Sequence, residues 1–107
     1  MTFRELNLKK PLWSALDELG YQTPTTIQAV SFNPMMSGKD TIGIAQTGTG
    51  KTLAYLLPCL CMWKFSKEPH PQILIIVPTR ELVAQVVSEV EKLTAYMNVV
   101  VGGVYSI

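Results

Sequence analysis

The stretch AQTGTGKT, residues 45–52, constrains this chain more than any other part of its sequence. It follows a short apolar run, TIGIA (41–45), and leads into the apolar segment KTLAYLLPCLCMW, which we expect to be a helix. Glycines let the backbone curl so that successive N–H groups point inward, and such a loop ahead of a helix N-terminus can bind an anion. The spacing therefore predicts a strand, a phosphate-binding loop and a helix.

The strict phosphate-loop pattern is G-x-x-x-x-G-K-[ST], and Ala45 replaces its first glycine here. Gly48, Gly50, Lys51 and Thr52 retain the rest of the pattern. In such a loop the lysine reaches the β- and γ-phosphates, and the threonine hydroxyl helps to hold Mg²⁺. The alternative is a glycine-rich turn that only connects a strand to a helix.

Two helices are expected before this loop. Apolar residues recur at helical spacing over 8–19, and a second helix is predicted to start at Thr23 and Pro24. The pair Asn33-Pro34 is expected to break or kink that second helix. We take residues 1–40 as a helical segment separate from residues 41–107.

From residue 41 onward the pattern predicts β-α-β-α-β. Strands are expected at 41–45, 73–77 and 99–101, and the amphipathic run 79–96 is a helix. The continuous apolar run ILIIV (73–77) is typical of a strand covered on both faces. Helical crossovers imply a parallel sheet, so we expect residues 41–107 to form part of a three-layer α/β domain.

Composition excludes several classes of protein. Charged residues make up 16% of the 107 residues, against about 25% in typical domains, and the net charge of +1 gives no general attraction to nucleic acid. Cys59 and Cys61 lie in an apolar run and are expected to be buried, reduced thiols rather than metal ligands. No apolar run is long enough to span a bilayer. We expect a cytoplasmic protein with no membrane association.

Three stretches together carry a resemblance to a known family. With alanine in first position, AQTGTGKT resembles motif I of the DEAD-box RNA helicases, within helicase superfamily 2. GYQTPTTIQ (20–28) is similar to their Q motif, PTRELVAQ (78–85) to motif Ia, and Gly102-Gly103 to the GG motif. The resemblance implies a P-loop NTPase (RecA-like) fold with N-terminal helices that carry the Q motif.

The resemblance also implies ATP and Mg²⁺ as cofactors. The implied ATP-binding residues are Phe3, Tyr21, Gln28, Gln46, Thr47, Gly48, Thr49, Gly50, Lys51 and Thr52. Lys51 and Thr52 are the implied catalytic residues, and Thr52 would hold Mg²⁺ directly or through water.

The implied adenine reader is Gln28. Its amide offers a donor and an acceptor side by side, which complements the N6/N7 edge of adenine. Tyr21 would stack on the base, and Phe3 would help to close the pocket. The alternative for Gln28 is a solvent-facing position on a helix.

The second implied ligand is RNA, gripped by its sugar-phosphate backbone without regard to base sequence. The implied contacts are Pro78, Thr79, Arg80, Gly102 and Gly103. Alternatively, Arg80 and Glu81 serve as structural links to neighbouring loops. Trp13 and Trp63 are expected in the core.

Thr26 and Val83 depart from the family pattern, which commonly has proline and alanine there, but neither change removes a ligand group. The D-E-A-D and S-A-T motifs and a second RecA-like domain do not occur in these 107 residues. We therefore expect an N-terminal fragment of a helicase that binds ATP weakly and does not hydrolyse it. The alternatives are a free-standing nucleotide-binding module, a truncated gene remnant, and, less favoured, another P-loop ATPase.

Overall fold

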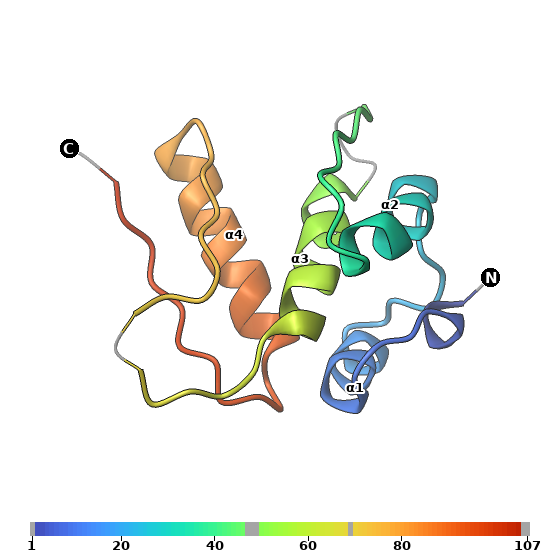
Figure 1. Ribbon diagram of the computed structural model, residues 1–107, viewed down its shortest axis with the longest axis horizontal. Helices are drawn as coiled ribbons and strands as arrows, with labels where there is room; N and C mark the ends of the chain where they lie inside the picture. Colours follow the sequence, from blue (N-terminus) through green and yellow to red (C-terminus); the bar gives the residue numbers. More distant parts are fainter. Residues whose placement is uncertain (1, 47–49, 69, 106–107) are drawn as a thin grey trace.

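The computed structural model describes residues 2–46, 50–68 and 70–105. Within these ranges the regular elements are a short 3₁₀ helix and four α-helices: η1 (Phe3–Glu5), α1 (Lys10–Glu18), α2 (Thr26–Met36), α3 (Lys51–Met62) and α4 (Arg80–Leu93). Helix α3 lies in the middle of the molecule, with α4 on one side and α1 and α2 on the other (Figure 1). The four predicted α-helices are confirmed.

Helix α2 differs from its prediction at both ends. Thr25 rather than Thr23 is the N-cap, and the first helical residue is Thr26. Pro34 lies inside the helix, which continues to Met36, so of the predicted break or kink the break is wrong, and the kink stays a prediction. A proline deprives the carbonyl four residues earlier of its hydrogen bond. Here that residue is Val30, which is 67% exposed, so water can replace the lost donor.

The predicted parallel sheet is absent from the described residues, and so is the three-layer arrangement built on it. Segments 41–45, 73–77 and 99–101 run as extended chain and contain no strand (Figure 1). Among the described residues, no backbone hydrogen bond joins one of these segments to another. A strand requires a neighbour that accepts and donates along its edge. The prediction of strands at these three segments is therefore wrong for the described residues, because the segments do not pair.

Segment 73–77 is covered on one face only, which corrects the expectation of two covered faces. Ile73, Ile75 and Val77 pack against the core. Leu74 and Ile76 point away and are 80% and 85% exposed. Successive side chains of an extended chain point to opposite sides, and the helices lie on one side only.

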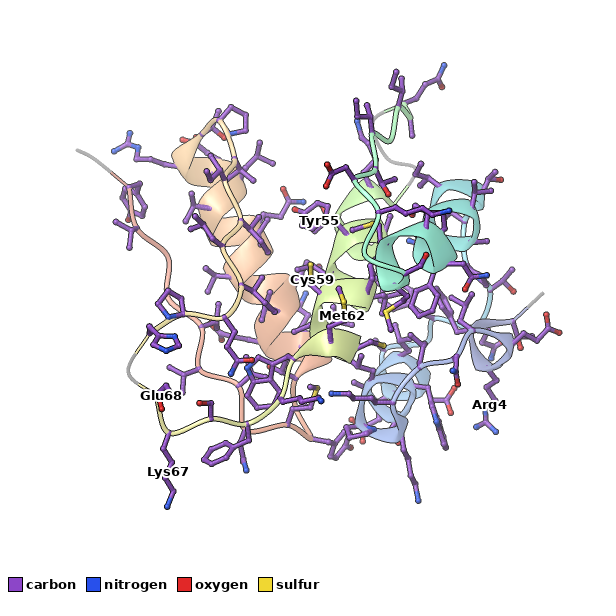
Figure 2. All side chains as sticks on the ribbon, viewed as in Figure 1. Arg4, Tyr55, Cys59, Met62, Lys67 and Glu68 are labelled. Carbon is purple, nitrogen blue, oxygen red and sulfur yellow. The ribbon has the colours of Figure 1, made fainter. Side chains whose placement is uncertain are left out.

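A cleft of about 390 Å³ is lined by residues of both segment 73–77 and segment 99–104, together with residues of α3 and α4. Its lining is mainly aliphatic and includes Leu56 on α3 and Val86 on α4. Cys59 also lines it and is labelled between these two helices in Figure 2. The two extended segments thus line the same cleft as α3 and α4, and no backbone hydrogen bond among the described residues joins them.

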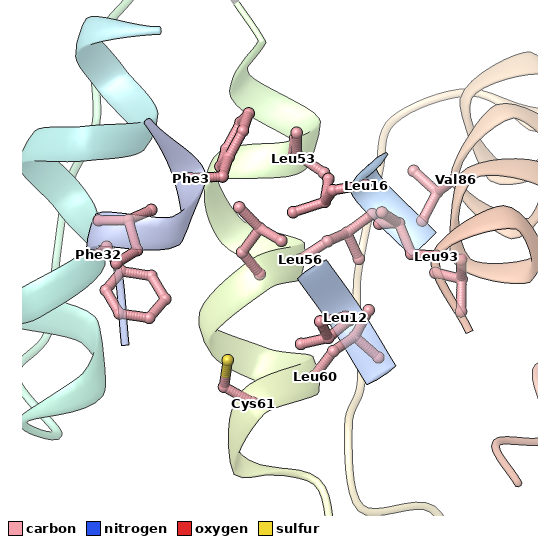
Figure 3. Close-up of a cluster of buried hydrophobic side chains, with 13 residues drawn as sticks. Phe3, Leu12, Leu16, Phe32, Leu53, Leu56, Leu60, Cys61, Val86 and Leu93 are labelled. Atoms are coloured by element: carbon pink, nitrogen blue, oxygen red, sulfur yellow. The ribbon is translucent and has the colours of Figure 1, made fainter. Parts of the chain in front are cut away.

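The core joins the N-terminal helices to the remainder of the chain (Figure 3). Leu12 and Leu16 of α1 are buried with Leu56 of α3 and Leu93 of α4, each at most 1% exposed. The division into 1–40 and 41–107 stays a prediction, and both parts contribute to one cluster of buried side chains.

Both cysteines are free thiols, as predicted, although Cys61 is buried and Cys59 only half-buried. Burial raises the pKa of each thiol above its ordinary value. Of the helices in the described ranges, none has the length and apolarity needed to cross a membrane.

Candidate nucleotide site

The phosphate loop meets α3 at Gly50. Gly50 has φ +84°, in the left-handed region that favours glycine, and it is the N-cap of α3. Lys51 and Thr52 are the first two residues of the helix, as predicted; Lys51 is exposed and Thr52 half-buried. The first N–H groups of a helix have no partner within it, so this end of α3 can receive an anion. Thr47, Gly48 and Thr49 lie outside the described residues.

Gln28 is buried beside this helix start. It is 5% exposed, which excludes the alternative of a solvent-facing side chain. Its Oε1 accepts a hydrogen bond from the backbone N–H of Thr25 at 2.9 Å. Its Nε2 donates to the Gly50 carbonyl at 3.1 Å. The side chain therefore connects the first turn of α2 with the residue that begins α3.

The contact between Gln28 and Thr25 has a local sequence signal. Thr25 and Gln28 form a capping box at the start of α2, and the pattern S/T-x-x-E/Q predicts such a pair. That pattern, rather than Thr23 and Pro24, places the helix start at Thr26. The Gly50 contact has no such signal, because it joins residues far apart in the sequence.

Phe3 and Tyr21 lie in different environments. Phe3 is 4% exposed and belongs to the core cluster, near Leu53 (Figure 3). Its backbone N–H donates to the Gln22 carbonyl at 3.0 Å, which holds the N-terminus against the segment that follows α1. Tyr21 is 42% exposed, so it is not part of the core. The predicted roles of both residues, and that of Gln46, stay predictions.

A separate hollow of about 380 Å³ lies beside the start of α2. Ile27 and Val30 of α2 line it together with Ile44 and Ala45 of the extended segment before the loop. Neither Phe3, Tyr21 nor Gln28 is among its lining residues. Thr25, the hydrogen-bond partner of Gln28, does line it, so the hollow adjoins the start of α2 without including the Gln28 side chain.

The residues implied in RNA contact gather around the first half of α4. Thr79 is the N-cap, and its Oγ1 accepts from the Leu82 N–H at 3.2 Å. Arg80 and Glu81 are exposed and form no ion pair with any residue that the structure describes. The alternative role as links between loops therefore has no supporting contact here. Pro78 immediately precedes the cap.

Gly103 lies against the same helix. A Cβ placed on Gly103 would come 2.8 Å from Cγ1 of Val83 and 3.0 Å from Cγ2 of Val87, whereas one on Gly102 would meet nothing within 4 Å. The structure thus brings the glycine pair next to the helix that begins at Arg80. In the sequence Val83 stands out only as a departure from a family pattern, and no local signal indicates this contact.

A family model described as DEAD/DEAH box helicase matches residues 25–106. The chain belongs to the DEAD/DEAH box helicase family. It is 44% identical over 108 residues to DEAD-box ATP-dependent RNA helicase 28 of Oryza sativa subsp. japonica, a match that covers 95% of this chain and 14% of the relative. It is 43% identical over 110 residues to ATP-dependent RNA helicase SrmB of Escherichia coli (strain K12), covering 96% of the chain and 25% of that relative.

Solved structures of DEAD-box proteins are similar to this chain. A DEAD box protein from the hyperthermophile Methanococcus jannaschii superposes with a TM-score of 0.82 and 31% identity, covering 98% of this chain and 30% of that one. The RNA helicase Prp28 from Chaetomium thermophilum, bound to ADP, gives 0.76 and 38%, covering 92% and 26%. The predicted resemblance to the DEAD-box RNA helicases is confirmed, and the fold matches part of their RecA-like domain. The chain spans about a seventh to a quarter of the length of these two curated relatives.

Proposed function

We propose that this chain is the ATP-binding part of the first RecA-like domain of a DEAD-box RNA helicase. The observation that carries the proposal is the arrangement at Gly50, where a left-handed glycine opens α3, Lys51 and Thr52 come next, and the buried amide of Gln28 lies alongside. An exposed lysine beside the first N–H groups of a helix, which have no partner within that helix, provides the charge and the donors that a polyphosphate requires.

Each residue has a distinct role in the proposal. Lys51 neutralises the terminal phosphates, and the N–H groups of the first turn of α3 donate to their oxygens. An amide has two N–H groups and an oxygen with two lone pairs. The contacts of Gln28 to Thr25 and Gly50 use one N–H group and one lone pair, and the remaining N–H group and lone pair bind the base. Tyr21, which is partly exposed, stacks on the base.

Among the described residues of this site, the candidate protein ligand for Mg²⁺ is the Thr52 hydroxyl. Mg²⁺ is usually held by one or two carboxylates together with substrate phosphates and waters, and the described residues contain no cluster of three His, Cys, Asp or Glu side chains. When bound, the ion would neutralise phosphate charge. We therefore propose that these 107 residues by themselves bind ATP without hydrolysing it at a useful rate.

Within the whole helicase, we propose that ATP binding and hydrolysis are coupled to RNA binding and local duplex unwinding. The RNA backbone would lie along the first half of α4, which begins with Thr79 and Arg80 and has Gly103 packed against its Val83. Helix N–H groups and a guanidinium grip phosphates and carry no base information. The names of the curated relatives, which are ATP-dependent RNA helicases, support this part of the proposal.

The test is calorimetric titration of the 107-residue chain with ATP, compared with its Lys51→Ala variant. Loss of a charge-assisted contact should weaken ATP binding by about tenfold or more. Lys39→Ala is the matched control, because Lys39 is an exposed lysine elsewhere on the chain and its side chain lies in no proposed contact. Equal ATP affinity in the wild type and Lys51→Ala would refute the phosphate site. Steady ATP turnover that depends on Lys51 would refute the claim of binding without hydrolysis.

A further inference from the structure

Both polar atoms of the Gln28 side-chain amide form hydrogen bonds within the protein. Its oxygen accepts from Thr25 N–H at 2.9 Å, and its nitrogen donates to the Gly50 carbonyl at 3.1 Å. A buried amide with one partner on each atom has a fixed orientation, because turning it over would oppose like groups at both ends. Gln28 is thus a rigid connection between α2 and α3.

The Gly50 carbonyl has two donors. Besides Gln28, it accepts from the Ala54 N–H at 3.1 Å, which is the hydrogen bond that closes the first turn of α3. The approach is close: a Cβ placed on Gly50 would come 2.3 Å from Nε2 of Gln28. The Gln28 amide therefore packs directly against Gly50, the N-cap of α3.

We propose that Gln28 positions the N-terminus of α3 for phosphate, and that it does so even when the ligand has no base. The inference rests on the proposed function, since it assigns a second task at the same site. It differs from base reading in one consequence: Gln28 contributes to the affinity for a bare polyphosphate. Helix N–H groups bind an anion well only when they are held in a fixed geometry, because ordering them during binding costs free energy.

The experiment measures the affinity of the full 107-residue chain for inorganic tripolyphosphate in the wild type and in Gln28→Ala. Losing one buried hydrogen bond to the helix start should weaken binding by about three- to tenfold. Ser31→Ala is the matched control: Ser31 lies on the same helix, is 7% exposed, and donates from Oγ to the Ile27 carbonyl at 2.6 Å. Its removal should leave tripolyphosphate binding unchanged.

Hydrogen exchange in the absence of ligand gives an independent readout. In Gln28→Ala the Ala54 amide should exchange faster, because the carbonyl it donates to loses its second anchor. The amide of Thr94, which donates to Val90 at the end of α4 at 3.0 Å, should keep its rate. If Gln28→Ala does not fold, Gln28→Asn replaces it, since asparagine keeps the amide but is too short to reach Gly50.

The outcomes separate this inference from the proposed function. Tripolyphosphate binding and Ala54 exchange that both match the wild type, with weaker ATP binding, would overturn the inference and leave Gln28 as a base reader only. A wild-type chain that binds neither ATP nor tripolyphosphate would instead refute the phosphate site itself. Weaker tripolyphosphate binding in Gln28→Ala but not in Ser31→Ala supports the inference.

Discussion

Gly103 lies so close to Val83 that a β-carbon on the glycine would come within 2.8 Å of the valine Cγ1. These residues are 20 positions apart, in the last extended segment and in α4. Their contact fixes the distance between the glycine pair and the helix that begins at Arg80. The space at Gly103 is therefore a property of the structure that can be tested by substitution.

Gly103→Ala should destabilise the chain by about 1–3 kcal/mol, because the added methyl overpacks against Val83 and Val87. Gly102→Ala is the matched control and should have little effect, since open space surrounds that position. Thermal unfolding measures both. The double variant Gly103→Ala/Val83→Ala should recover much of the loss, and a double variant less stable than either single one would contradict the contact.

In segment 73–77, the loss of stability on substitution should alternate from one residue to the next, large where the side chain packs against the core and small where it is exposed. Ile75→Thr should cost about 1–3 kcal/mol, because Ile75 packs against the core and the new hydroxyl would be placed among apolar side chains. Leu74→Thr should stay within about 0.5 kcal/mol, since Leu74 is 80% exposed. It should also reduce aggregation, because it removes apolar surface beside an unpaired edge. Equal losses in urea unfolding of both variants would mean that the segment is covered on both faces.

Arg80→Ala should weaken binding of single-stranded RNA by a similar factor for every base sequence tested. A guanidinium that contacts phosphate contributes about one unit to the slope of log affinity against log salt concentration, so the slope should fall by about one. Lys92→Ala, in the last turn of the same helix, serves as the control. A change in sequence preference, or an unchanged salt slope, would show that Arg80 does not bind phosphate.

Alkaline pH should destabilise the chain through Cys61. Burial raises the pKa of this thiol above its ordinary value of 9.0, with a smaller opposing effect of Lys9. The unfolded chain therefore releases this proton at lower pH than the folded chain, so stability falls as pH rises above about 9. Unfolding free energies measured from pH 7 to 10 should decline less in Cys61→Ala than in the wild type. Parallel declines would mean that other groups are responsible.

The sequence by itself determined that four α-helices form, although not both ends of α2, and to which family the chain belongs. Pro11 and Gly20 bound α1, and the apolar period of 79–96 specifies α4, because these signals act between residues close together in the chain. The start of α3 at Lys51 is equally determined by Gly50, whose left-handed φ suits glycine. The motifs that carry the DEAD-box resemblance, and their spacing, can likewise be found in the amino-acid sequence without the structure.

Only the tertiary structure decided how the extended runs and the site residues are placed. The run 73–77 has the composition of a strand, but whether it pairs depends on a neighbour at its edge, and no described residue supplies one. Likewise the Q motif identified Gln28, while its bond to Gly50 depends on how α2 packs beside α3. Local sequence specifies the conformation of one segment; hydrogen bonds between distant segments exist only after packing has brought the two groups together.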